Sequence, residues 1–210
     1  MSVDSAIAAL ARGEFVLVVD DADRENEGDL IMAAEFANAE NIAFMVRYTS
    51  GLICLPTTKY RLEELDVPMM ELDNTESMQT AFTISVDYAH GTTTGISAAD
   101  RARTIQAFVD PSARPADFRR PGHICPLRYH EGGVLKRPGH TEAAVDLAKL
   151  AGLSPAGVLC EIVNDDGTMM RGEDLDTFAE KHDLVKISIE DLVAHRWRTE
   201  QLVARVSEAT

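Results

Sequence analysis

The 210-residue sequence predicts an α+β fold, a three-layer α/β/α sandwich built around a mixed, twisted β-sheet. Predicted strands and helices alternate along the whole chain, and several predicted strands are continuous apolar runs, which are typical of strands buried on both faces. We find no linker, no internal repeat of domain size and no low-complexity segment. We therefore expect one domain that spans residues 1–210.

Apolar periodicity and stop signals define the elements of the first half of the chain. They are a helix over residues 3–12 that stops at Gly13, strands over 15–19 and 30–34, a helix over 40–49, a strand over 52–55 that ends at Pro56, a helix near 60–65 and an alternating strand over 81–86. A loop follows over 91–95. Ser97 and Asp100 then fit a capping box for a helix that runs to about residue 109.

The second half of the chain begins with a segment that we predict to be irregular. Residues 111–138 contain five prolines, and a loop this long inside a compact domain usually serves a function. Beyond it we expect a helix over 141–151 that ends at Gly152, a strand over 157–163, a tight turn over 164–167, a helix over 173–181 and a strand over 184–189. Ser188 and Asp191 fit the capping box of a last helix that reaches about residue 206.

Charge and cysteine content limit the partners and the compartment. A net charge of −15 argues against a nucleic-acid or anionic-membrane partner, because both would be repelled. No apolar run approaches the roughly 20 residues of a membrane span, and the N-terminus has no signal-peptide pattern. The three cysteines are odd in number and unclustered, as in reduced cytosolic proteins. We expect a cytoplasmic protein, which can still hold a small anionic substrate in a local pocket.

Residues 20–29, called the acidic loop below, carry six carboxylates in ten positions. Such a run is either a solvated acidic turn or a site for a divalent cation with oxygen ligands, Mg²⁺ or Mn²⁺. Its position directly after a buried strand favours the second interpretation, because ligand sites in open sheets collect at strand ends. An EF-hand calcium loop starting at Asp23 is excluded, because its twelfth position would be Ala34 and both flanks look like strands.

The tetrapeptide Arg-Pro-Gly-His occurs twice, at residues 120–123 and 137–140. Each copy places a guanidinium, which suits phosphate or carboxylate, beside an imidazole that can carry protons or bind metal. Pro-Gly predicts a turn or loop for both copies. The second copy precedes Thr141 and a helix, and helix amides, an arginine and a threonine hydroxyl together suit a phosphate. An ordinary threonine cap with a structural histidine is an equally good interpretation of this segment alone. Residues 91–97 carry a weaker signal of the same kind.

Glu161 lies within the apolar run of residues 158–163. A carboxylate on a buried strand binds its proton more tightly, which is typical of a general acid or base. The competing interpretation is that strand alternation points Glu161 toward solvent. Cys54 sits in another apolar run, and we expect it to be a buried small side chain without a nucleophilic role.

These segments together resemble the 3,4-dihydroxy-2-butanone 4-phosphate synthase family of riboflavin biosynthesis. The residues that carry the resemblance are the acidic loop, Ser50-Gly51 with Cys54, and residues 93–101, 120–127, 132–144 and 155–169, in the family's order along nearly the whole chain. The resemblance implies a cytoplasmic lyase, a homodimer with its active sites at the subunit interface. It also implies that the enzyme uses Mg²⁺ or Mn²⁺ to convert ribulose 5-phosphate into 3,4-dihydroxy-2-butanone 4-phosphate and formate.

The same resemblance implies a role for individual residues. Metal would be held by Glu25 and His140, and His123 and Glu161 would form the catalytic pair. Substrate would be bound by Arg24, Glu25, Asp29, Thr94, Arg137, Gly139, His140, Thr141 and Glu161. The two tetrapeptide copies would thus differ, since His140 would bind metal and His123 would transfer protons.

Three questions stay open at the level of sequence. In many relatives this domain is fused to a GTP cyclohydrolase II domain, so the chain can be a stand-alone enzyme or the N-terminal part of such a fusion. A different metal-dependent enzyme on sugar phosphates, a phosphatase or an isomerase, is the alternative function. A metal- or phosphate-binding module without catalytic activity is a third.

Overall fold

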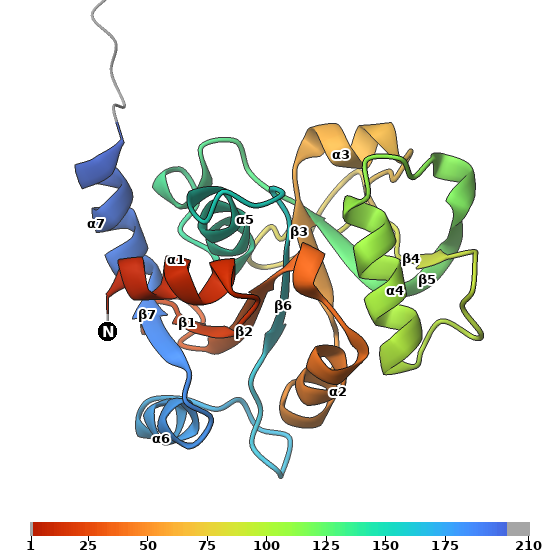
Figure 1. Cartoon of the computed structure of the whole chain (residues 1–210). Helices are drawn as coiled ribbons and strands as arrows, with labels where there is room; N and C mark the ends of the chain where they lie inside the picture. Colours follow the sequence, from red (N-terminus) through yellow and green to blue (C-terminus); the bar gives the residue numbers. More distant parts are fainter. Residues whose placement is uncertain (1, 201–210) are drawn as a thin grey trace, which may run out of the picture.

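The structure is a computed structural model that describes residues 2–200 (Figure 1). Its centre is a seven-stranded sheet in the order β4-β5-β3-β6-β2-β1-β7. The strands are β1 Val16–Val19, β2 Gly28–Ala33, β3 Cys54–Thr57, β4 Val86–Tyr88, β5 Phe118–Arg128, β6 Gly157–Glu161 and β7 Val185–Ser188. The pairs β1·β7 and β3·β5 are parallel and the other neighbouring pairs antiparallel, so the sheet is mixed as predicted.

Helices cover both faces of the sheet. They are α1 Val3–Ala11, α2 Ala39–Tyr48, α3 Lys59–Glu64, α4 Ala98–Val109, α5 His140–Leu150, α6 Glu173–Lys181 and α7 Ile189–Thr199, with single 3₁₀ turns at Ala34–Phe36, Pro115–Asp117 and Gly133–Leu135. None of the described helices is long and apolar enough to cross a membrane.

Two apolar clusters, one on each face of the sheet, confirm the three-layer prediction. Along β2, Leu30 and Met32 pack with α2, α3, α4 and α6, whereas Ile31 and Ala33 pack with α1, α5 and α7. This alternation follows from the two-residue period of a strand. Both sets of side chains are fully buried, as predicted for a strand covered on both faces.

Most predicted elements are confirmed to within a few residues. At the start of α7, Ser188 and Asp191 each accept a hydrogen bond from the other's backbone N–H, so this capping box is complete. At α4 only half of the box forms: Ser97 caps the backbone of Asp100, but the Asp100 carboxylate accepts bonds from Thr93 and Gly95 instead. Helix α7 ends at Thr199, and the rest of its expected length to residue 206 lies outside the described residues.

The prediction of an irregular segment over residues 111–138 is wrong, because β5 runs through its middle. The first Arg-Pro-Gly-His copy therefore lies in a strand and not in a loop. The strand tolerates Pro121 because its partner β4 is short and carries a register shift between Val86 and Asp87, so the missing N–H interrupts no regular ladder. Gly122 brings the two strands together, since a Cβ atom there would overlap with the backbone of Val86 and Asp87.

Two further strand predictions need correction. Strand β3 does not end at Pro56 but continues to Thr57, because Pro56 pairs in parallel with β5 where the ladder to β6 is sparse. The predicted strand over residues 81–86 is mostly a chain of isolated bridges. Thr83 and Phe82 pair with the segment near Met69 and with β5, and the regular strand begins only at Val86.

Candidate functional site

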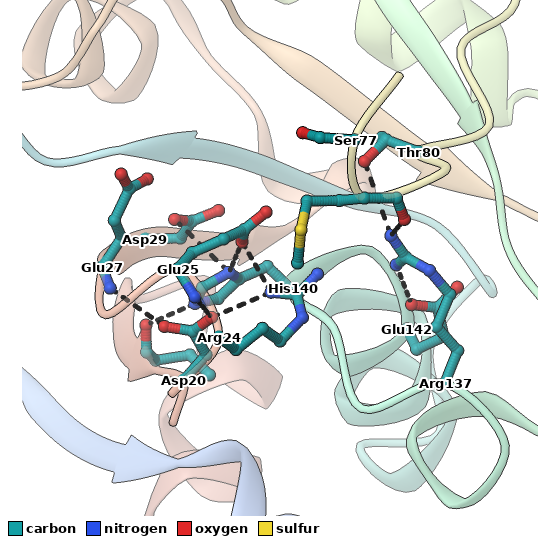
Figure 2. Close-up of polar contacts among 12 residues, drawn as sticks. Asp20, Arg24, Glu25, Glu27, Asp29, Ser77, Thr80, Arg137, His140 and Glu142 are labelled. Carbon is teal, nitrogen blue, oxygen red and sulfur yellow. Dashed lines mark hydrogen bonds and ion pairs between the residues drawn. The ribbon is translucent and has the colours of Figure 1, made fainter. Parts of the chain in front are cut away.

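The acidic loop joins the antiparallel strands β1 and β2 and is organised by one of its own carboxylates. The buried side chain of Asp20 accepts hydrogen bonds from Arg24 Nη1 at 2.9 Å and from the backbone N–H groups of Glu25 at 3.0 Å and Glu27 at 2.9 Å. Arg24 also bridges to Glu25 Oε2 at 2.5 Å. These contacts hold Glu25 in a fixed direction (Figure 2). The loop is thus a folded polar network, which goes against the solvated-turn interpretation.

The second tetrapeptide copy delivers His140 to this loop. His140 is the first residue of α5, and its Nε2 lies 3.2 Å from the carbonyl oxygen of Val18 on β1. A carbonyl can only accept, so Nε2 donates its proton to Val18, and Nδ1 is the nitrogen directed into the site. Nδ1 faces Glu25 Oε2 at 3.6 Å and Asp29 Oδ1 at 3.7 Å. Figure 2 shows this ring and the carboxylates of the loop pointing toward one another.

Burial and neighbouring charges shift the pKa values of Glu25, Asp29 and His140. Burial raises the pKa of Asp29 to about 7. Burial lowers the pKa of His140, but the charge of Asp29 and the hydrogen bond with Glu25 outweigh it and bring the pKa to about 9. The hydrogen bond with His140 and the charge of Arg24 lower the pKa of Glu25. Such strong coupling among buried groups is typical of functional sites.

The donor set fits a divalent cation. Ligand atoms of Asp20, Glu25 and His140 lie within 4.8 Å of one another. Both oxygens of Asp20 are already occupied by the loop, whereas Asp29 Oδ1 is buried and has no hydrogen-bond partner among the described residues. Glu25 and His140 therefore offer donor atoms to the same cluster, and the unpartnered Asp29 Oδ1 lies 3.7 Å from His140 Nδ1 beside it. The bond from His140 to Val18 is the kind of outer contact that fixes a metal-binding tautomer.

Mg²⁺ affinity should consequently rise with pH. Binding through Nδ1 requires neutral His140, whose pKa is about 9, so below that pH each bound ion must displace a proton. We expect the apparent affinity to increase about tenfold per pH unit between pH 7 and 9. Calorimetric titrations in buffers of different ionisation enthalpy would measure both the affinity and the released proton. An affinity that is constant over this range would contradict binding by His140.

An anion-binding corner lies beside the carboxylates. Helix α5 begins at the pocket, and no side chain caps its N-terminus at Gly139, so its first amides remain available. The buried Glu142 accepts a 2.7 Å bond from Arg137 Nη1, and the carbonyl of Met78 accepts one of 3.0 Å from Nη2. These bonds aim the guanidinium (Figure 2). A Cβ atom at Gly139 would crowd it at 2.5 Å, which explains the glycine.

A pocket of about 210 Å³ joins the carboxylates to this corner. Among the residues that line it are the predicted site residues Arg24, Glu25, Asp29, Arg137, His140, Thr141 and Glu161. Glu161 ends β6 directly opposite Asp29 of β2, and its Oε2 accepts a 2.6 Å bond from the Ser50 hydroxyl. It is half-buried, so the interpretation that strand alternation turns Glu161 out to solvent is not supported. Cys54 also lines the pocket, where burial holds the pKa of its thiol well above the ordinary value, as expected for an inert cysteine.

Three predicted residues, His123, Thr94 and Gly139, are not among the residues that line this pocket, although Gly139 directly precedes His140 at the start of α5. His123 lies on β5 and pairs with Asp87, and Gly95 packs against that pair, while Thr94 is exposed beside it. We call His123, Asp87 and residues 93–95 the His123 cluster.

The sheet nevertheless brings the His123 cluster toward Glu161. Cys54 of β3 pairs with Cys125 of β5 and with Leu159 of β6. His123 lies two residues beyond Cys125 and Glu161 two beyond Leu159, toward the same end and the same face of the sheet. Two strand spacings separate them, about 10 Å.

Sequence patterns missed several residues that organise the site. Asp20 was one acid among six, and only the structure distinguishes the carboxylate that folds the loop from those that face the pocket. Asp87 stands in a three-residue strand that the sequence pattern does not reveal. Glu142 directly follows the predicted phosphate-binding residues, and its acidic side chain next to Arg137 was a usable signal.

The α+β sandwich and this pocket, which combines metal donors with an anion-binding corner, define a class of metal-dependent enzymes acting on small phosphorylated molecules. The family model for 3,4-dihydroxy-2-butanone 4-phosphate synthase matches residues 4–195. The chain belongs to this family, and the resemblance inferred from its motifs is confirmed.

Individual relatives agree with this membership. The 3,4-dihydroxy-2-butanone 4-phosphate synthase of Agrobacterium fabrum is 56% identical over 193 residues, which cover 92% of this chain and 91% of that protein. The riboflavin biosynthesis protein RibBA of Salinispora arenicola is 59% identical over 208 residues, 99% of this chain but 50% of RibBA. The chain thus spans about half the length of its RibBA relatives. A crystal structure of 3,4-dihydroxy-2-butanone 4-phosphate synthase in complex with two magnesium ions is 46% identical with a TM-score of 0.92, covering 95% of this chain and 98% of that one.

Proposed function

We propose that this chain converts D-ribulose 5-phosphate into L-3,4-dihydroxy-2-butanone 4-phosphate and formate with the help of Mg²⁺ or Mn²⁺, as a lyase of riboflavin biosynthesis. The observation that carries this proposal is that one pocket brings the candidate metal donors together with an uncapped helix N-terminus and a fixed arginine. A phosphorylated sugar needs both features at once, one for its hydroxyl and carbonyl oxygens and one for its phosphate.

Each side chain has a part in this proposal. Arg137, Thr141 and the first amides of α5 hold the phosphate, and Glu25 and His140 hold the ion, with Asp29 beside them. Arg24, Thr94 and Gly139 are further substrate contacts. When bound, the ion supplies Lewis-acid polarisation of the substrate's carbonyl oxygen.

His123 and Glu161 move the protons. A proton is taken from the carbon beside the ketone to give an enediol, water is lost, the carbon skeleton rearranges, and one carbon leaves as formate. The two products together contain all the atoms of the substrate, so water is lost and regained and no oxidant or second substrate is required. Ser50, which donates to the Glu161 carboxylate at 2.6 Å, orients that group for its role.

We further propose a homodimer whose active sites lie at the subunit interface. Exposed apolar side chains beside the His123 cluster support it: Leu52 is 48% exposed and Ile96 53%. Apolar side chains that protrude next to polar functional groups are typical of protein–protein contacts. Sedimentation equilibrium of the full chain would give the mass, and a monomer at micromolar concentration would contradict this part of the proposal.

The domain and the compartment are also proposals. The match of the family model to residues 4–195 supports one synthase domain over residues 1–210, and RibBA shows that such a domain also occurs as half of a longer protein. All three cysteines are free thiols, which supports a reducing, cytoplasmic compartment.

A proton NMR assay tests the proposed reaction. Ribulose 5-phosphate and Mg²⁺ should give the formate signal and a methyl ketone in equal amounts, and a chelator should stop both. Inorganic phosphate without formate would instead indicate a phosphatase, and a new pentose phosphate without formate an isomerase. No formate with Mg²⁺ or Mn²⁺ would refute the proposal.

A further inference from the structure

The two Arg-Pro-Gly-His copies hold their imidazoles through opposite nitrogens. His140 uses Nε2 to reach a backbone carbonyl, which leaves Nδ1 free. His123 uses Nδ1, which lies 2.7 Å from Asp87 Oδ2, so Nε2 is the nitrogen left free. The partners differ as well, since one is a neutral carbonyl and the other a carboxylate.

The Asp87 carboxylate contacts His123 at two points, one on the backbone and one on the ring. Its Oδ1 accepts the backbone N–H of His123 at 2.9 Å while its Oδ2 faces the ring nitrogen. The Asp87 side chain is 9% exposed and that of His123 40%. The acid is therefore shielded from water, whereas the ring keeps an accessible edge that a substrate can approach. An ionised carboxylate only accepts, so the ring must carry its proton on Nδ1.

The local backbone is built around this pair. The register of β4 and β5 shifts between Val86 and Asp87, next to the contacts of Asp87 with His123, and Gly122 lets the two strands approach. Gly95 covers the pair from the other side, and a Cβ atom there would overlap with the Asp87 carboxylate and with Nδ1 of His123. Gly95 also has a φ of 95°, which favours glycine. The close approaches at Gly122 and Gly95 thus limit the space around the two side chains.

We propose that Asp87 is a positioning residue that holds His123 in its Nδ1–H tautomer and so makes Nε2 the atom that exchanges a proton with the substrate. This inference rests on the proposed function, in which His123 is part of the catalytic pair. A carboxylate behind a catalytic imidazole fixes its tautomer and orientation and stabilises the cation formed when it takes a proton. Sequence order gives no hint of the pairing, because the two residues are 36 positions apart.

The Asp87→Asn variant tests the proposal. The amide can donate to Nδ1 and force the other tautomer, so we expect kcat for formate production to fall by about 10²- to 10⁴-fold, and by no more than in His123→Ala. KM and Mg²⁺ affinity should stay within about twofold, because the metal and phosphate contacts are elsewhere. Two-dimensional ¹⁵N NMR of labelled imidazoles should show the His123 proton on Nδ1 in the wild-type protein and on Nε2 in the variant.

Three controls separate positioning from a general structural effect. The Asp117→Asn variant changes the other short Asp–His pair, in which Asp117 Oδ1 lies 3.0 Å from the exposed His90, and should leave kcat unchanged. Asp87→Glu keeps the carboxylate and should restore a large part of the lost rate. In the His123→Ala background, Asp87→Asn should cause no further loss, because its effect acts through the ring.

These experiments distinguish failure of the positioning role of Asp87 from failure of the proposed function. A wild-type protein that makes no formate refutes that function. A wild-type protein that makes formate, together with an Asp87→Asn variant that keeps the wild-type kcat or the Nδ1–H tautomer, overturns the positioning role. A further loss in the double variant, or no recovery with glutamate, overturns it as well.

Discussion

Replacing His140 with alanine is expected to remove both Mg²⁺ binding and formate production, whereas replacing His123 with alanine removes formate production alone. His140 presents a free Nδ1 to Glu25 and Asp29, so its loss takes away one of the few donors of the proposed metal site. We expect Mg²⁺ affinity to fall by about 100-fold or more. His123 lies outside this cluster, and its loss should lower kcat by about 10²- to 10⁴-fold, the usual contribution of one acid–base group.

Measuring metal binding and catalysis in both variants shows whether the histidines of the two Arg-Pro-Gly-His copies have different roles or share one metal site. Calorimetry, or electron paramagnetic resonance with Mn²⁺ as the probe, reports metal binding without any need for turnover. The formate assay then reports catalysis. Equal loss of metal in both variants would mean that the two histidines share one metal site, and the structural separation described above would be wrong.

Replacing Gly122 with alanine is expected to destabilise the folded protein strongly. The new Cβ atom would overlap with the backbone of Val86 and Asp87, and backbone atoms in a paired strand cannot move aside as a flexible side chain can. We expect the free energy of unfolding to fall by about 3 kcal/mol or more. The forced separation of β4 and β5 should also break the contact of Asp87 with His123 and thereby lower kcat.

Gly152→Ala is the matched control. Gly152 follows α5 with a φ of 73° and has no atom within 4 Å of its Cβ position, so alanine there adds backbone strain without a collision. Its cost should be about 1 kcal/mol. Urea unfolding of both variants gives the comparison. A Gly122→Ala protein that is as stable as Gly152→Ala would show that β4 and β5 do not need this close approach.

Local sequence patterns predicted those helices and strands that depend on residues close to one another in the chain. The apolar run before the acidic loop, the capping box at Ser188 and the amphipathic helices each follow from contacts within a few residues. Strand β5 could not be predicted from local sequence, because its two prolines and its glycine indicate a loop unless the partner strand is known. The pairing of β5 with β4 and β3 supplies that information and is not local.

The difference between local and non-local information also explains which site residues could be predicted from the sequence. The acidic loop and the second tetrapeptide copy are contiguous motifs, so their residues could be named from sequence and reach one pocket in the structure. The supporting residues come from distant segments. Asp87, Ser50 and Glu142 become meaningful only when the fold sets them against His123, Glu161 and Arg137. Polar residues that act on another side chain leave no periodic trace in a sequence.

Strand β6 has a consequence for how a ribosome produces this protein. It occupies the middle of the sheet but is the sixth of seven strands to be synthesised. Until it emerges, the β1–β2 hairpin and the β4–β5–β3 sheet are two unjoined pieces, and β2 and β3 each keep an open edge that can pair with another chain. Glu161 ends this same strand. The step that closes the nascent sheet therefore also delivers the proposed catalytic carboxylate, so no shorter nascent chain can be active.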